Sequence, residues 1–204
     1  MTKLDGSDPH DFPKSLNEEA ARYEVEAEFG ETMRVDLGPR IDSLPPPAPV
    51  GGNILEIMRW SLRLRYWAWR VATYEGLEPQ VRIFVVYFDP KKTNTVTHSL
   101  GIEKGAIGVV NAFASEEMAG QNNVVIAHEL AHTLGATDKY DPATTLPRHP
   151  EGYARPDAEP LYPQRFAELM GGRTPLSASE AKVPTSLNET IIGEATAREI
   201  HWLD

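Results

Sequence analysis

The 204-residue chain contains no cysteine. Disulfide bonds and thiolate metal ligands are therefore excluded, so any metal site has to rely on histidine and carboxylate. Basic residues are also scarce, because 20 Lys and Arg face 30 Asp and Glu and leave a formal net charge of −10. A phosphate backbone would repel this balance, so no nucleic-acid partner is expected and basic or neutral partners fit better.

Long hydrophobic runs are missing as well. Residues 1–13 are polar and lack the apolar region of a secretory signal peptide, so a cytoplasmic location is the default expectation. No membrane span is expected either, because the most apolar helical stretch, near residues 54–74, contains four arginines. The composition, 41% hydrophobic and 25% charged, suits one globular domain with extensions, and a monomer is the default.

The most informative motif is HELAH, which places His128 and His132 four positions apart. In an α-helix that step rotates about 40° past a full turn and rises about 6 Å, so both imidazoles can reach one metal ion. Glu129 lies to the side, where it can contact a metal-bound water without being a ligand. Gly135 tolerates positive φ and can turn the chain so that Asp138 reaches the same ion. Three such groups plus water are common in zinc hydrolases, which predicts a Zn²⁺ site with Glu129 as general base.

The motif belongs to an apolar run, which predicts a helix over Gln121–Leu134 with its other face buried. The ordinary alternative is a pair of helix histidines that only cap or pack.

The pattern HExxHxxGxxD at 128–138 resembles the zinc-binding signature of the metzincin clan of metallopeptidases, in the aspartate variant of the snapalysin-like bacterial enzymes. The resemblance implies a zinc-dependent endopeptidase acting on a peptide or protein, with ligands His128, His132 and Asp138. It also implies an α/β (α+β) zincin domain with a small twisted mixed sheet, an active-site helix and a C-terminal helix. A methionine turn is expected beneath the metal, and ELMGG with Met170 is the candidate. Such clan members are mostly secreted, so export by another route stays open.

The chain departs from the clan pattern at Gly172, where many members have a tyrosine two residues after the turn methionine. Tyr140 is the candidate replacement as a catalytic residue, and Tyr153 and Tyr162 are alternatives. For each of the three, a surface or packing role is the simpler interpretation.

The third ligand also has rivals, namely Asp141 and, as in gluzincins, Glu168. The glycine pair at 171–172 argues against the second helix from which gluzincins present that glutamate, so Asp138 is preferred. Two other classes of function stay open: a zinc amidohydrolase acting on a small amide, and a metal-stabilised binding module or latent protease capped by its own N-terminus.

Residues 1–50 are acidic and end in a proline-rich stretch, which predicts an N-terminal extension before a metallopeptidase domain at 51–204. A short helix over Leu16–Phe29 could block the cleft as a prosegment would, but a solvated tail is the simpler expectation.

A helix is expected from Asn53, with Glu56 completing a capping box, to about Tyr74. Its broad apolar stripe is expected to pack against a sheet, while its arginines leave a membrane-surface helix as the alternative. The residues of this stripe are Ile54, Leu55, Ile57, Met58, Leu62, Leu64, Ala68, Trp69, Val71 and Ala72.

Three strands are expected between the two main helices: a central strand at 81–88, another at 93–102, and a cleft-lining edge strand at 105–113. A long loop at 141–163, with His149 as a surface residue, should follow the metal motif. Ser186 and Glu189 form a second capping-box pattern, which predicts a helix reaching Trp202.

Overall fold

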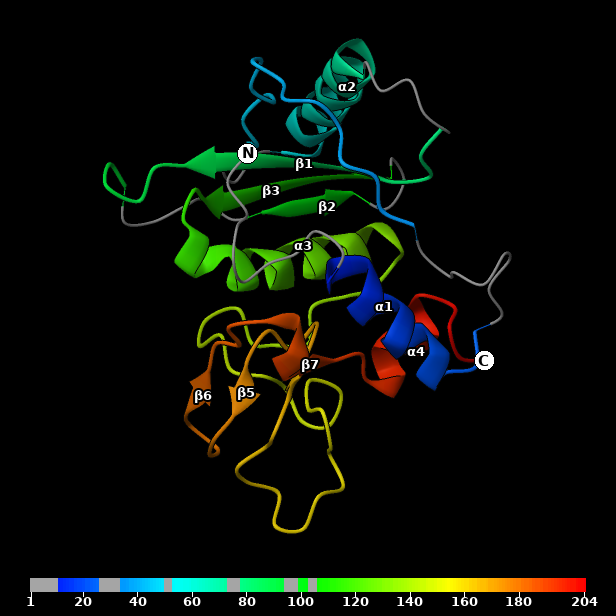
Figure 1. Ribbon diagram of the computed structural model, residues 1–204, viewed down its shortest axis with the longest axis vertical. Coiled ribbons are helices and arrows are strands. Elements are labelled where there is room, and N and C mark those ends of the chain that lie inside the picture. Colours follow the sequence, from blue (N-terminus) through cyan, green and yellow to red (C-terminus); the bar gives the residue numbers. More distant parts are fainter. Residues whose placement is uncertain (1–10, 26–33, 50–52, 73–77, 94–98, 103–105) are drawn as a thin grey trace.

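The computed structural model describes residues 11–25, 34–49, 53–72, 78–93, 99–102 and 106–204. It is an α+β protein, which confirms the predicted fold class. A small sheet lies between helix α2 on one face and helix α3 on the other (Figure 1). The α-helices in the described residues are α1 (Asp11–Arg22), α2 (Ile54–Val71), α3 (Ala119–Thr133) and α4 (Glu194–Glu199).

The main sheet has the strand order β1-β3-β2, where β1 is Arg82–Phe88, β2 is Leu100–Ile102 and β3 is Ile107–Phe113. Strand β1 pairs with β3 in parallel, and β2 pairs with it antiparallel. The predictions of a central strand at 81–88 and an edge strand at 105–113 are therefore both wrong. Strand β3 is central in the described sheet because it pairs with β1 on one side and with β2 on the other. Which strands pair depends on contacts between separate segments, and the apolar pattern of one strand cannot reveal it.

Shorter elements complete the described part of the chain. Two-residue strands form two pairs, one single-turn 3-10 helix directly precedes α3, and another precedes β7 and α4. These are β4 (Ala167–Glu168) with β7 (Thr190–Ile191), β5 (Thr174–Pro175) with β6 (Ala181–Lys182), η3 (Glu116–Met118) and η4 (Leu187–Glu189).

Helix α1 belongs to the main hydrophobic core. Phe12 and Leu16 are buried in the same cluster as Leu130 of α3 and Ile200. Polar contacts fix the helix further, because the Ile192 N–H donates to the Glu19 carboxylate at 2.8 Å. The expectation of a solvated tail is therefore wrong for this helix, whose apolar face has a partner almost 200 residues away in sequence. Part of the predicted 16–29 helix, from residue 26 on, lies outside the described residues.

Helix α2 begins with the predicted capping box, in which Asn53 and Glu56 each accept the other's backbone N–H. Leu64 and Ala68 are buried against the sheet, and the Trp67 ring contacts Phe84 of β1 edge-on at 4.7 Å. Most of the predicted packing stripe, however, is exposed to solvent. That prediction is wrong because α2 has two apolar faces, and the sheet covers only one.

The C-terminal helix is shorter than predicted. Ser186 makes no side-chain capping hydrogen bond, and the chain first forms η4 and then β7, which pairs with β4. Helix α4 begins only after Gly193, so the predicted start near Ser186 is wrong. Residues 190–191 pair with β4 instead of forming the helix that the local sequence favours.

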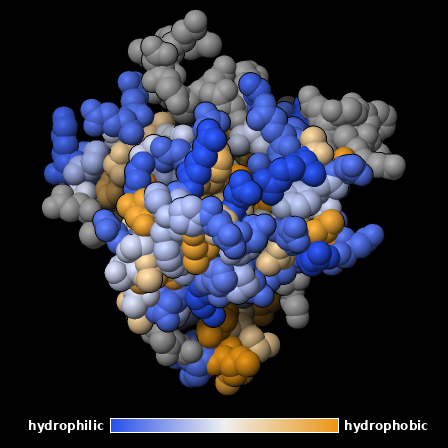
Figure 2. Space-filling view, turned by 90° about the horizontal axis from the view of Figure 1, so that it is seen from below, coloured by the Kyte–Doolittle hydropathy of each residue, from blue (hydrophilic) through white to orange (hydrophobic). Residues whose placement is uncertain are grey.

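The loop predicted at 141–163 is confirmed, since that stretch has no helix and only isolated β-bridges. The face that contains it is mostly hydrophilic, with hydrophobic residues in small separate groups (Figure 2). Among the helices of the described residues, none has both the length and the hydrophobicity that a membrane span requires.

Candidate metal centre

Helix α3 and the turn after it bring three potential metal ligands together. The Asp138 Oδ1 atom lies 3.1 Å from His128 Nε2 and 3.2 Å from His132 Nε2. Gly135 has φ of +107°, a conformation that glycine adopts without strain, and it reverses the chain after the helix. One ligand atom from each of the three residues lies within 4.8 Å of the others, so the group could hold a metal ion.

Backbone carbonyls orient both imidazoles. His128 Nδ1 lies 3.0 Å from the Leu169 oxygen, and His132 Nδ1 lies 2.8 Å from the Ala136 oxygen. A carbonyl can only accept, so each Nδ1 donates its proton to the carbonyl, and Nε2 is the ring nitrogen that faces Asp138 and that a metal could use when the imidazole is neutral. Metal-binding histidines commonly donate the N–H of their other ring nitrogen to such a carbonyl.

The donor set and its spacing fit zinc. Zinc binds imidazole nitrogen and carboxylate oxygen at about 2.0–2.2 Å in tetrahedral geometry, which separates neighbouring donors by about 3.3–3.5 Å. The two observed nitrogen-to-oxygen distances, 3.1 and 3.2 Å, are close to that spacing.

The electrostatics of the group match its geometry. Burial opposes ionisation of Asp138, but hydrogen bonds to His128 and His132 outweigh it and hold the pKa of this carboxyl well below its usual range. Burial likewise opposes protonation of His132, yet its bonds to Asp138 and the Ala136 carbonyl raise the pKa of the imidazole. The aspartate is therefore ionised and ready to bind a cation.

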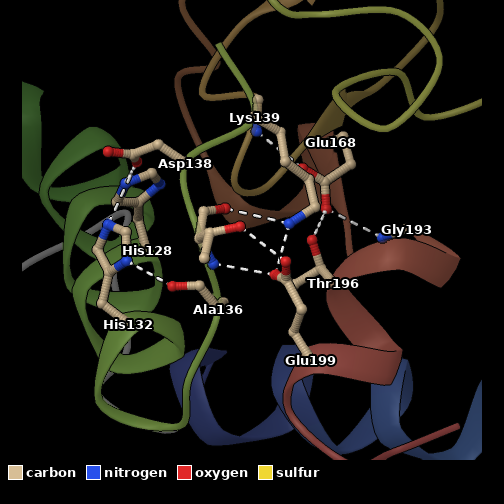
Figure 3. A network of polar contacts seen from close by, with 11 residues as sticks. His128, His132, Ala136, Asp138, Lys139, Glu168, Gly193, Thr196 and Glu199 are labelled. Carbon is tan, nitrogen blue, oxygen red and sulfur yellow. Dashed lines mark hydrogen bonds and ion pairs between the residues drawn. The ribbon is translucent and has the colours of Figure 1, made fainter. Parts of the chain in front are cut away.

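A second polar network holds the chain segment 137–139, which includes Asp138, in place (Figure 3). The Thr137 N–H and hydroxyl donate to the Glu199 carboxylate of α4 at 2.9 and 2.7 Å. The buried Lys139 ammonium donates to the same carboxylate at 2.5 Å and to the Thr137 oxygen at 3.1 Å. On the opposite side, the Lys139 N–H donates to the Met170 oxygen at 2.9 Å. Asp138 is thus fixed between two anchored neighbours.

Sequence reasoning missed Lys139 and Glu199. No local pattern joins a lysine in a turn to a glutamate 60 residues later. The only available signal was the position of Lys139 directly beside a suspected ligand.

The two rival ligands have other partners. The Glu168 carboxylate is fully buried and accepts hydrogen bonds from the Gly171 and Gly193 N–H groups and the Thr196 hydroxyl. Asp141 accepts the N–H groups of residues 143 and 144 and so caps a turn. Within the described residues, the group of His128, His132 and Asp138 is the one found to have metal-binding geometry, and neither rival belongs to it.

The predicted catalytic residues lie close to this group. Glu129 is on α3 between the two histidines in sequence and is 6% exposed. The Tyr140 ring centroid is 6.4 Å from that of His128, and the pKa of Tyr140 is raised by burial and by the charge of Asp138. A β-carbon at Gly172 would lie 3.9 Å from the Tyr140 ring, so this ring occupies the space beside the position where the clan tyrosine is missing.

The other candidate residues have local roles. The hydroxyls of Tyr153 and Tyr162 share a hydrogen bond at 2.8 Å, and burial together with this contact raises the pKa of Tyr153 to about 12. His149 Nε2 lies 3.1 Å from the Pro156 oxygen, within the loop. Met170 is completely buried in the same hydrophobic core as Leu130 of α3, directly after the residue whose carbonyl orients His128.

Comparison of this chain with protein-family models, with curated proteins and with solved structures gives no match. The resemblance to the metzincin clan therefore depends on the motif, and the structure adds the His-His-Asp group that could bind a metal.

Proposed function

We propose that this protein is a zinc-dependent endopeptidase of metzincin type. The observation that carries the proposal is the convergence of two imidazole Nε2 atoms and one ionised carboxylate at a common point. Backbone carbonyls orient both histidines through Nδ1, and metal-binding histidines commonly have such a partner on the ring nitrogen that does not bind the metal.

Each residue has a defined task in this proposal. Zinc, when bound by His128, His132 and Asp138, supplies a Lewis acid that polarises the scissile carbonyl and lowers the pKa of water to about 7. Glu129 accepts the proton of the attacking water on its carboxylate and passes it to the leaving amine. The Tyr140 hydroxyl, beside Asp138, donates a hydrogen bond to the oxygen of the tetrahedral intermediate, in place of the tyrosine that position 172 lacks.

A substrate peptide would pair with β2 rather than β3. Strand β3 has a neighbour on each side, whereas β2 is an edge of the described sheet and packs near α3. An extended peptide could add to the outer edge of β2 through backbone hydrogen bonds, which favours an endopeptidase over a hydrolase of small amides.

Metal content and hydrolysis should be measured together on the full chain and on two variants. We expect one zinc per chain and chelator-sensitive cleavage of casein for the unaltered protein. Glu129→Gln should keep the zinc and lose at least about 100-fold in hydrolysis, the usual effect of removing a general base. The exposed Glu117, just before α3, provides the control, and Glu117→Gln should leave both quantities unchanged.

Three results would redirect the proposal. Full activity in Glu129→Gln at equal zinc content would remove the proposed mechanism. Bound zinc with cleavage of small amides alone would favour an amidohydrolase. Absence of any metal in protein purified without chelator would return the histidine pair to a structural role.

A further inference from the structure

Helix α2 presents a second apolar face to solvent. At about 100° per residue, Trp60, Leu64, Trp67 and Ala68 fall on one side of the helix, which is the side packed on the sheet. The opposite side is a mainly apolar stripe along α2, interrupted by Arg65 and called here the outer face. It comprises Ile54, Leu55, Met58, Leu62, Tyr66 and Trp69, which are 56–74% exposed.

The segment at 34–49 packs beside α2 without covering this outer face. The indole N–H of Trp60 donates to the Pro46 oxygen at 2.9 Å, and that of Trp67 donates to the Ser43 hydroxyl at 3.0 Å. Both contacts are made from the sheet-facing side of the helix. Large apolar patches that stay exposed in this way mark interaction surfaces.

The charges around the outer face point to an anionic partner. Arg59, Arg63 and Arg70 adjoin one border of the outer face, and Arg65 lies within it. Glu56 is the only acidic residue of α2, so this helix is basic on a chain whose formal net charge is −10. Apolar residues bordered by arginines are typical of helices that lie in a lipid interface, where the arginines reach the phosphate groups.

A second copy of this chain fits the outer face poorly. Two α2 helices packed through their outer faces would bring the border arginines of both copies, Arg59, Arg63 and Arg70, together against two glutamates, which costs electrostatic energy. The shape also disfavours a groove-binding peptide, because α2 lies as a ridge on the sheet at the top of the molecule (Figure 1). A ridge with tryptophan and tyrosine beside leucine and methionine fits the boundary between lipid headgroups and acyl chains.

We propose that the outer face of α2 docks this protein on an anionic membrane surface, with the helix axis parallel to the bilayer. The metal-binding group lies on α3, on the far side of the sheet from α2 (Figure 1). The docked protein would therefore direct its metal site away from the lipid and toward water-soluble substrates. This inference does not depend on the proposed peptidase activity.

Vesicle co-sedimentation tests the docking directly. The full chain should sediment with phosphatidylcholine vesicles that contain phosphatidylserine, and much less with phosphatidylcholine alone. Raising the salt concentration should weaken the binding, because the arginine contribution is screened. Removing two charges in Arg63→Gln/Arg70→Gln should lower the partition coefficient about 30-fold, since one arginine near an anionic surface contributes roughly fivefold.

A matched pair of variants distinguishes binding through the outer face from nonspecific binding to vesicles. Leu62→Glu/Trp69→Glu should abolish vesicle binding without loss of helicity by circular dichroism, because both side chains are 65–71% exposed. Tyr87→Glu is the control: Tyr87 is 62% exposed, and alternation along β1 places it on the face opposite Phe84, which contacts α2. This control should bind vesicles normally.

Two outcomes would overturn the proposal. One is binding that does not require phosphatidylserine or that persists in Leu62→Glu/Trp69→Glu. The other is a failure to bind either kind of vesicle. If the protein then sediments as a dimer that Leu62→Glu/Trp69→Glu dissociates, the outer face belongs to a second copy of the chain.

Discussion

Removal of the Glu199 carboxylate should loosen the metal centre from a distance. Glu199 touches none of the three metal-binding side chains, but it accepts hydrogen bonds from both neighbours of Asp138 in the chain. In Glu199→Ala, the buried Lys139 ammonium loses its carboxylate partner, and Thr137 loses two acceptors. We therefore expect a loss of folding stability together with a loss of metal affinity.

The size of the effect follows from the contacts. Each Thr137 hydrogen bond is worth about 1 kcal/mol. Breaking a fully buried ion pair costs about 3–5 kcal/mol, but the Glu199 side chain is 32% exposed and Lys139 keeps the Thr137 oxygen as an acceptor, so about half of that is expected. The sum is about 4 kcal/mol of unfolding free energy, or a fall in Tm of roughly 10 °C for a chain of this size. Metal affinity should fall about tenfold, as is common when an outer partner of a metal site is removed.

Urea denaturation of the chelator-treated protein measures the stability loss without a contribution from metal, and chelator competition then measures the affinity. Glu194→Ala is the control, since Glu194 is on the same helix with a 78% exposed side chain and should change stability by less than about 0.5 kcal/mol. Lys139→Met combined with Glu199→Ala should cost about 2 kcal/mol less than the sum of the single changes, because the two side chains share one ion pair. Additive single changes, or a Glu199→Ala effect no larger than that of the control, would refute the reasoning.

Further outcomes concern the site itself. Asp138→Ala should lower zinc affinity by more than tenfold in chelator competition, because one of three ligands is removed, and unchanged zinc stoichiometry would mean that another carboxylate is the third ligand. Tyr140→Phe should reduce kcat about 100-fold with unchanged zinc content and KM, as expected for the loss of one donor to the transition state, and an unaltered kcat would leave the tyrosine a packing role. Burial opposes protonation of His132, but its hydrogen bonds to Asp138 and the Ala136 carbonyl raise its pKa above 6.5. Protonated His132 therefore stabilises the metal-free folded protein. This stabilisation is fully present below pH 6.5 and is lost as the pH rises through the folded-state pKa. Urea denaturation with chelator should show the free energy of unfolding falling as the pH rises. With saturating zinc the free energy of unfolding should instead rise with pH, because zinc requires the neutral imidazole. The same pH dependence in both conditions would show that His132 does not bind the metal.

The geometry of the candidate metal-binding group could be predicted from the sequence because its residues are close together in the chain. The spacing of His128 and His132 fixes their common face on any α-helix, and a glycine followed by Asp138 returns the chain after one tight turn. The capping box at Asn53 is likewise a contact between residues three positions apart, and it is present as predicted.

The errors have a common physical cause. The order of the strands, the burial of α1 in the core and the late start of α4 all depend on partners that are far away in sequence. Helix α2 is the clearest case, since both of its sides have the apolar periodicity of a packed helix and only the position of the sheet selects one of them.

The sequence by itself therefore determined the local geometry of the candidate metal ligands, the main helices and the absence of thiol chemistry. Only the tertiary structure decided what holds that geometry in place: the carbonyls of Leu169 and Ala136 that orient the histidines, and the ion pair of Lys139 with Glu199 that anchors the strand of chain bearing Asp138. Side-chain spacing along one helix is set by covalent geometry and backbone hydrogen bonds, whereas contacts between distant segments form only when the whole core packs.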